Sequence, residues 1–252
     1  MDISGRIRAV LGGVDFRGNE EQVFAVMVRS VLGTLGEKWR VHDTPRHIET
    51  YRLEHGRLMA AGMMRVRGKR DSQEMGRLMG RIQQETEEDL GRTDARPGEL
   101  LWGHWLLTLS EKLGGAANDR AMMKRLWERG VGAEMGTFHR LTSETLLDGF
   151  VYDELVAIHA AYNSAKVMGD EGMMERVGRA VRWHVENTQP DNATNEPWGL
   201  AAFAALDETG TFAEQQLHDA VMGLRNSPAL PNGQVPVAVG LLADAVMTLE
   251  NW

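Results

Sequence analysis

The chain has 252 residues, of which 42% are hydrophobic and 25% are charged, and its formal net charge is −8. This length is enough to bury a large core, and the acidic balance argues against a nucleic-acid partner, which requires a basic surface. The absence of cysteine excludes disulfides, thiolate catalysis and cysteine-ligated metal sites. The first residues lack a signal-peptide pattern, and no apolar run reaches membrane-spanning length. The sequence therefore predicts a cytoplasmic protein with no membrane span.

Apolar residues recur three and four positions apart along most of the chain, which is the spacing of α-helices, and no segment shows the alternation of a strand. Glycine, proline, asparagine and aspartate separate the helical segments. After a mixed N-terminal segment, helices are predicted over residues 20–35, 45–67, 71–90, 98–113, 118–129, 143–168, 171–187, 197–206, 211–224 and 235–249.

The predicted helices form repeated pairs. The first helix of each pair opens near an aromatic residue, at Tyr51, Trp102, Tyr152 and Trp198, about 50 residues apart, and a period of this size is typical of stacked supersecondary units. We therefore expect one all-α domain over residues 1–252. It contains about five helical hairpins, with joints near 44–51, 91–102, 139–152, 188–198 and 226–235.

Alternate hairpins match each other better than neighbours do. Asp94 and Glu99 have the same spacing as Asp191 and Glu196, and a Trp-Gly pair follows each, at Trp102-Gly103 and at Trp198-Gly199. The first helix of each later pair is apolar on most faces, and the second is amphipathic, so the first is expected to be buried and the second to cover it. Alternating inner and outer helices predict an α/α toroid with a cavity at its axis. The alternative is an open α–α superhelix.

The stretch from Val181 to Asp191, followed by Trp198, resembles a repeat of the squalene-cyclase and prenyltransferase superfamily of α/α toroids. The resemblance is clearest over residues 173–206. In that repeat an outer helix ends in a tryptophan and a polar amide, here Trp183 and Asn187. A Pro-Asp-Gly-type turn then leads to an aromatic residue that opens the next inner helix. The resemblance implies a toroid that binds an apolar or isoprenoid ligand in its central cavity.

The sequence departs from that superfamily in four ways. Asn192 stands where the turn prefers glycine, and the loop before Trp198 is longer. The acidic motif of the cyclases is missing, and no cysteine is present to serve as the zinc ligand of protein prenyltransferases. The resemblance therefore supports a fold more directly than an activity.

The 188–198 joint and its counterpart near 91–102 carry the candidate catalytic residues. Paired carboxyl groups at a cavity can serve as general acid and base when burial or a neighbouring charge raises the pKa of one of them. Histidines on the inner helices are proton-transfer candidates, with a hydrogen-bonded core role as the alternative. The predicted catalytic residues are Asp191, Glu196, Asp94, His104 and His159.

A ligand site is predicted beside these groups. Trp102, Trp105 and Trp198 would stack on a sugar or an isoprenoid chain, with a role as core anchors as the alternative. Asn192 and Asn195 of the 188–198 joint complete the predicted site, although both can also cap turns and helices. The histidines show no zinc-ligand spacing, and no glycine-rich phosphate loop is present. We therefore predict neither a metal nor a cofactor.

Arg29 and Asp244 are charged residues in otherwise apolar helices near the two ends of the sequence. Because a buried charge needs a partner, we expect them to pair and close the ring.

Three functions fit these patterns. The first is a terpenoid-cyclase- or prenyltransferase-like toroid that binds an apolar or isoprenoid ligand. The second is a glycan-active α/α-barrel hydrolase or lyase that uses cavity carboxylates. The third is a non-catalytic helical scaffold for a protein partner. Whether the chain is an enzyme is left open by the sequence.

Overall fold

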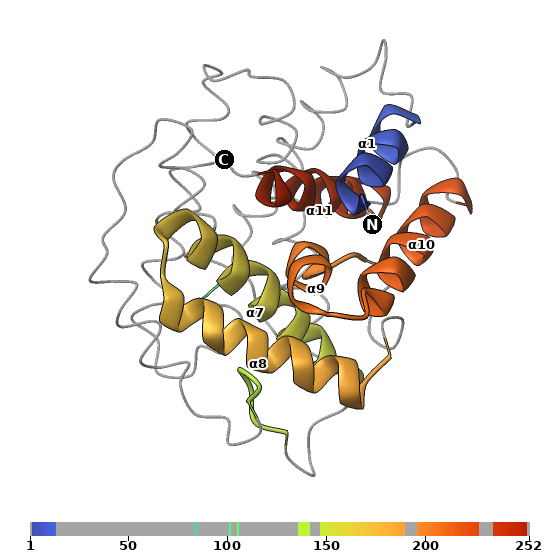
Figure 1. The fold of residues 1–252 in the computed structure, drawn as a ribbon. Coiled ribbons are helices and arrows are strands. Elements are labelled where there is room, and N and C mark those ends of the chain that lie inside the picture. Colours follow the sequence, from blue (N-terminus) through green and yellow to red (C-terminus); the bar gives the residue numbers. More distant parts are fainter. Residues whose placement is uncertain are drawn as a thin grey trace.

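The computed structural model of the chain describes residues 2–13, 84, 101, 105, 136–141, 147–189, 196–226 and 234–250. Within these residues all regular secondary structure is helical and no strand occurs, which confirms the predicted all-α class. The hairpins predicted before residue 136 lie outside the described residues, apart from single positions. The helices are α1 (Ile3–Gly13), α7 (Leu147–Met168), α8 (Glu171–Asn187), α9 (Leu200–Leu206), α10 (Thr211–Asn226) and α11 (Gln234–Leu249) (Figure 1).

Helices α7 and α8 form the hairpin that the sequence predicts. Gly169 makes the turn with a φ of 65°, and the Asp170 side chain caps α8 by accepting the Met173 backbone N–H at 3.0 Å. Helix α7 is buried on nearly every face from Phe150 to Ala165, whereas α8 buries one stripe and exposes the opposite face. An inner helix and its amphipathic cover therefore lie side by side (Figure 1).

Helix α9 begins at Leu200, three residues later than the Pro197 start predicted from the apolar pattern. Gly199 has a φ of 73°, so the backbone turns left-handed immediately before the helix. Residues 196–199 instead form a turn in which the Leu200 N–H bonds the Pro197 carbonyl at 3.3 Å. A side chain at Gly199 would also be crowded, because a Cβ would lie 3.1 Å from Phe203 and 3.2 Å from Ile158.

From α7 to α11, each helix packs against the next one in the sequence. Helix α9 lies between α7 and α11 and contacts both, while α8 and α10 pack beside them as covering helices (Figure 1). The three inner helices share one core, and many of its side chains are fully buried. Phe203 of α9 stacks on Phe212 of α10 with ring centroids 4.0 Å apart, which joins an inner helix to its cover.

Helix α1 lies in the segment that the sequence pattern left as mixed, so this helix was missed. It packs against α11 and α10 (Figure 1). Ile3 and Ile7 are buried in the shared core, and on the solvent side Arg8 pairs with Glu250 and Arg6 with Glu214. The first and last helices that the structure describes are therefore in direct contact.

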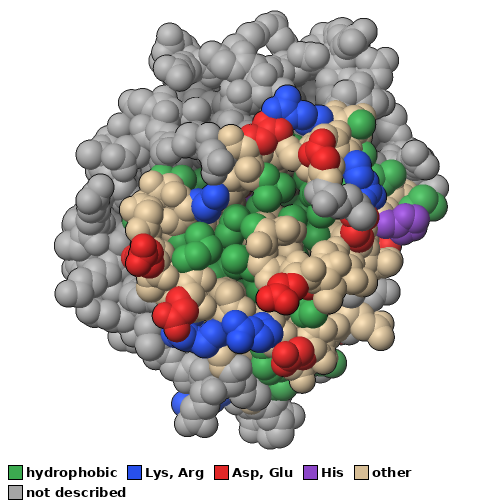
Figure 2. All heavy atoms as spheres, viewed as in Figure 1, with side chains coloured by type: hydrophobic (Ala, Val, Ile, Leu, Met, Phe, Trp, Pro, Cys, Tyr) green, Lys and Arg blue, Asp and Glu red, His purple; other side chains and the backbone are tan. Residues whose placement is uncertain are grey.

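None of the described helices is long and apolar enough to cross a membrane. On the face shown in Figure 2, apolar side chains occupy the middle, and acidic and basic side chains lie around them.

Candidate functional site

The turn between the 188–198 joint and α9 holds a carboxyl group against two aromatic side chains. Glu196 Oε2 accepts the Trp198 indole N–H at 2.9 Å and the Tyr152 hydroxyl at 3.4 Å. The rings of Tyr152 and Trp198 meet edge to face, with centroids 6.1 Å apart. Tyr152 comes from the first turns of α7, so the inner helix and the joint build this group together.

The environment of Glu196 changes its acidity. Burial raises the pKa of Glu196 to about 7, although the hydrogen bonds from Trp198 and Tyr152 act in the opposite direction. The residue is only partly buried. A carboxyl group with a pKa near neutrality is present in both protonation states at pH 7, so it can donate a proton to a bound ligand or accept one.

A second group lies on the other side of Trp198 and is centred on Asp244 of α11. Asp244 Oδ2 accepts hydrogen bonds from Trp105 Nε1 at 3.0 Å and from Asn163 Nδ2 at 2.9 Å. His159 Nε2 lies 2.9 Å from the same oxygen. All four side chains are almost completely buried. The carboxylate thus binds donors from α7 and from Trp105, a residue well before α7 in the sequence.

The two ring nitrogens of His159 have different partners. Nδ1 accepts the Gly199 backbone N–H at 3.4 Å, so the ring proton lies on Nε2 and is donated to Asp244. The edge of the His159 ring also meets the Trp198 ring, with centroids 5.5 Å apart. Because protein groups contact both nitrogens, His159 is placed to orient the Trp198–Gly199 turn rather than to exchange a proton with a ligand.

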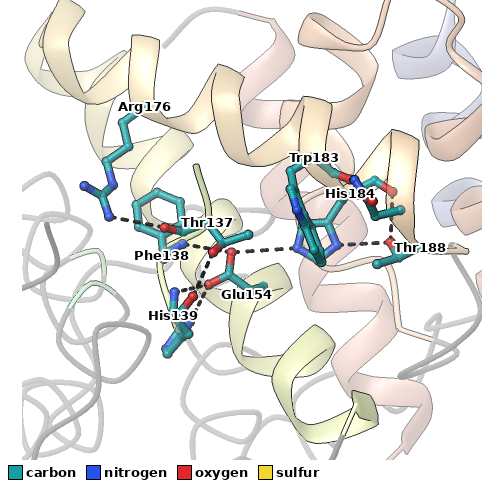
Figure 3. A network of polar contacts seen from close by, with 9 residues as sticks. Thr137, Phe138, His139, Glu154, Arg176, Trp183, His184 and Thr188 are labelled. Atoms are coloured by element: carbon teal, nitrogen blue, oxygen red, sulfur yellow. Dashed lines mark hydrogen bonds and ion pairs between the residues drawn. The ribbon is translucent and has the colours of Figure 1, made fainter. Parts of the chain in front are cut away.

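A third group surrounds Glu154, one of two consecutive carboxyl residues inside α7 (Figure 3). Its Oε2 accepts the Phe138 backbone N–H at 2.9 Å. Its Oε1 accepts the His139 backbone N–H and lies 2.6 Å from His139 Nδ1. His184 Nε2 of α8 faces Oε2 at 3.7 Å. Burial alone would raise the pKa of Glu154, but hydrogen bonds and charge from the two histidines lower it to about 2.

The segment that Glu154 binds, residues 136–140, is also held from α8. Arg176 Nη2 donates to the Thr137 carbonyl at 3.4 Å, and its guanidinium lies 5.1 Å from the centroid of the Phe138 ring. Thr137 and Phe138 are buried as a result. His139 lies outside the helices, and its backbone and its ring both contact the buried Glu154 carboxylate.

The structure brings together four of the predicted site residues: Glu196, His159, Trp105 and Trp198. Trp105 is 1% exposed and Trp198 is not exposed at all, and each indole N–H donates to a carboxylate. Their faces are covered by the chain, as the alternative role of core anchor requires. The other predicted site residues lie outside the described residues: Asp94, Trp102, His104, Asp191, Asn192 and Asn195.

The predicted partner of Asp244, Arg29, also lies outside the described residues. The described partners of Asp244 are the polar side chains of Trp105, His159 and Asn163. Within the part of the chain that the structure describes, no group of three or more histidine or acidic residues has the arrangement of a metal site.

Two residues of these groups were not predicted from the sequence: Tyr152 as a partner of Glu196, and Glu154. The sequence does contain a pattern from which Glu154 could have been predicted. Asp153 and Glu154 stand next to each other in a stretch that is otherwise apolar, and carboxyl groups in a buried helix need partners. Burial, together with the neighbouring Glu154, raises the pKa of Asp153 to about 8.

Comparisons with protein-family models, with curated proteins and with solved structures each found no match to this chain.

Proposed function

We propose that this chain is a glycan-active α/α-barrel protein in which Glu196 exchanges a proton with a sugar held at the 188–198 joint. A general acid for a glycosidic bond needs a carboxyl group that stays partly protonated near neutral pH. A sugar also supplies hydroxyl and glycosidic oxygens that can hydrogen-bond to this group. Asp191, in the same joint, is the proposed second carboxylate.

The observation that carries the proposal is the environment of Glu196. Its carboxyl group is partly buried, bonds to Trp198 and Tyr152, and has a pKa raised to about 7. Two other buried carboxylates, Asp244 and Glu154, bind several protein donors each. Asp153 also has a raised pKa, of about 8, but it is buried inside α7. Glu196 is only partly buried, so it is the better suited of these carboxyl groups to reversible protonation by a ligand.

The α/α toroid is proposed as the scaffold. The packing of α7, α9 and α11 against one another, with α8 and α10 as covers, supports alternating inner and outer helices. The contact of α1 with α11 supports ring closure. The resemblance to the squalene-cyclase and prenyltransferase repeat points to the same scaffold.

The test combines binding with activity. Purified protein is titrated by calorimetry with cellotriose, chitotriose, xylotriose and maltotriose, and cleavage of each is followed by chromatography of the products. We expect one of these oligosaccharides to bind and to be cleaved. Glu196→Gln should lower cleavage by roughly 100-fold or more, because general acid–base catalysis contributes at least that factor. It should leave binding largely intact, since the amide oxygen can still accept both hydrogen bonds.

The matched control is Glu186→Gln, which alters an exposed glutamate on α8 and should change neither measurement. If none of the oligosaccharides binds, or if cleavage is the same in Glu196→Gln as in the wild type, the proposal is wrong.

An isoprenoid ligand is the second candidate. The observation in its favour is the apolar character of the inner helices, which bury Phe150, Leu200 and Phe203. Farnesyl diphosphate is therefore included in the same titration. Binding of farnesyl diphosphate without binding of any oligosaccharide would favour this candidate, and binding of neither would favour a scaffold for a protein partner.

A further inference from the structure

Residues at both ends of the 188–198 joint contact a buried histidine. Thr188, which follows α8, lies at the start of the joint, and Gly199, which precedes α9, lies just after its end. His184 contacts the first of these residues and His159 contacts the second. Each histidine in turn faces a buried carboxylate on a different helix. At both ends, therefore, a buried carboxylate faces a histidine, and that histidine contacts a residue at the end of the joint.

The first pair is Glu154 with His184 (Figure 3). The Glu154 carboxylate on α7 and His184 Nε2 on α8 are 3.7 Å apart, and neither side chain is exposed. His184 Nδ1 lies 3.1 Å from the Thr188 hydroxyl oxygen. The Thr188 hydroxyl and backbone N–H both donate to the His184 carbonyl, at 3.0 and 2.9 Å. These bonds fix the direction in which the chain leaves α8.

The second pair is Asp244 with His159. The Asp244 carboxylate on α11 holds the Nε2–H of His159, so Nδ1 is left as the acceptor for the Gly199 N–H. The His159 ring also packs edge-on against Trp198, and Trp198 donates to Glu196. A continuous series of contacts thus runs from α11 through α7 to the Glu196 carboxyl group.

We propose that Glu154–His184 and Asp244–His159 are two pairs of positioning residues that hold the joint at its two ends and so set the orientation of Glu196. This inference rests on the proposed role of Glu196. The pairs touch no ligand themselves. They act through Thr188 at one end and through the Trp198–Gly199 turn at the other.

The chemistry of the pairs favours this role over simple stabilisation. An apolar group of similar volume usually stabilises a buried site at least as well as a buried ion pair does. Asp244 lies within hydrogen-bond distance of His159 Nε2, and a carboxylate that fixes the tautomer and ring orientation of a histidine adds direction, which an apolar contact cannot supply. Glu154 and His184 interact at the longer distance of 3.7 Å, through charge. Among the described residues, the charged and titratable groups that interact with Glu154 besides His184 are Asp153 on α7, Arg176 on α8 and His139.

The experiment follows Glu196 itself. The protein is labelled with ¹³C at glutamate carboxyl groups, the Glu196 signal is assigned by its loss in Glu196→Gln, and its pH titration is recorded. The variants are Asp244→Ala, which removes the acceptor of the His159 proton, and Thr188→Val, which removes the hydroxyl beside His184. The matched conservative variants are Asp244→Asn and Thr188→Ser, which keep an oxygen in place. Asp219→Asn on α10 is the remote control.

We expect Asp244→Ala and Thr188→Val each to lower the Glu196 midpoint by about half a pH unit or more, since a loosened turn admits water and reduces the effect of burial. Cellotriose, chitotriose, xylotriose or maltotriose, whichever the wild type binds, should bind these two variants roughly tenfold more weakly or worse, because displaced catalytic geometry is costly. Asp244→Asn, Thr188→Ser and Asp219→Asn should stay close to the wild type in both measurements.

The outcomes separate the two proposals. A wild-type Glu196 that titrates below pH 5 contradicts the proposed function. A Glu196 that titrates near pH 7 in the wild type, and unchanged in folded Asp244→Ala and Thr188→Val, contradicts the positioning pairs alone. If Asp244→Ala does not fold, long-range ¹H–¹⁵N spectra of the wild type provide the test. His159 must then carry its proton on Nε2 at pH 7, and a proton on Nδ1 overturns the second pair.

Discussion

At Glu196, burial and hydrogen bonding act on the same carboxyl group in opposite directions, and burial has the larger effect. Its pKa is raised from 4.5 to about 7, so the folded protein binds this proton more tightly than the unfolded chain does. The resulting contribution to stability is complete below the unfolded value of 4.5 and is lost as the pH rises through about 7. Asp153, with a pKa raised from 3.8 to about 8, acts in the same direction.

Glu196→Gln removes one of these two contributions. Between about pH 5 and pH 8 the wild type should lose up to about 3 kcal/mol more unfolding free energy than Glu196→Gln does, since each pKa unit corresponds to about 1.4 kcal/mol. Urea denaturation at the two pH values measures the difference. Equal losses in both proteins would mean that Glu196 titrates in the folded protein as it does in the unfolded chain.

Glu154 predicts the opposite pH dependence, because its pKa is lowered from 4.5 to about 2. Its contribution to stability is present above 4.5 and is lost as the pH falls towards 2. Glu154→Ala should cost roughly 3–5 kcal/mol at neutral pH, because it leaves the buried partners of a charged group unpaired. It should also speed hydrogen exchange at the Phe138 and His139 amides, which Glu154 binds. Unchanged exchange at those two amides would contradict the assigned hydrogen bonds.

Some of the site residues could be predicted from the sequence, and others could not because their contacts are long-range. Glu196 and Trp198 could be singled out because they lie in a short polar joint, and His159 because it interrupts an apolar helix. The link from His159 to Asp244 spans 85 positions, and the link from Glu154 to residues 138 and 139 depends on how a non-helical segment folds back. Helical spacing gives no information about contacts of either kind.

At the scale of elements, the turn before α9 requires glycine at position 199. Its φ is 73°, and an added Cβ would lie 3.1 Å from Phe203 and 3.2 Å from Ile158. Gly199→Ala should therefore destabilise the protein by about 1–3 kcal/mol, through backbone strain and crowding together. The reduction in melting temperature measures this effect.

Gly178, in the interior of α8, is the matched comparison, because a Cβ there would meet no atom within 4 Å. Gly178→Ala should stabilise the protein by about 0.5–1 kcal/mol, the usual gain for a helix interior. If Gly199→Ala stabilises the protein as Gly178→Ala does, the left-handed turn before α9 is not required.

Element boundaries were predictable where capping residues mark them. The predicted helix over 171–187 coincides with α8, because Gly169 and Asp170 end one helix and cap the next. The predicted end of the preceding helix at Met168 is also correct. The start of α9 was misplaced, because Pro197 is a common first helical residue and the left-handed turn at Gly199 was not foreseen. Helix α1 was missed because its apolar stripe is short and depends on packing against α11.

For the whole molecule, the contact between α1 and α11 connects distant parts of the chain. Ile7 of α1 is completely buried in the core that the later helices share. Ile7→Ala should cost about 2–5 kcal/mol, the usual range for such a truncation, and should lower the melting temperature of the whole protein in a single transition. Arg8→Ala, at an exposed ion pair with Glu250, should have little effect. A separate early transition of α1 alone would argue against its being part of the shared core.

The all-α class could be predicted because helical periodicity is a local property, and the described helices confirm it. Closure into a toroid is a proposal, supported by the contacts of α7, α9 and α11 with one another and of α1 with α11. Closure depends on pairing between residues far apart in sequence, so the apolar pattern favours a ring but leaves an open superhelix as the alternative.

The most direct test of the central claim is the pH titration of the Glu196 carboxyl group in the wild-type protein, followed by its ¹³C chemical shift. The structure, through the burial of Glu196 beside Trp198 and Tyr152, predicts a midpoint near 7. The same signal should move when the oligosaccharide that the protein binds is added. A midpoint at or below 4.5, the ordinary value for glutamate, would contradict the account.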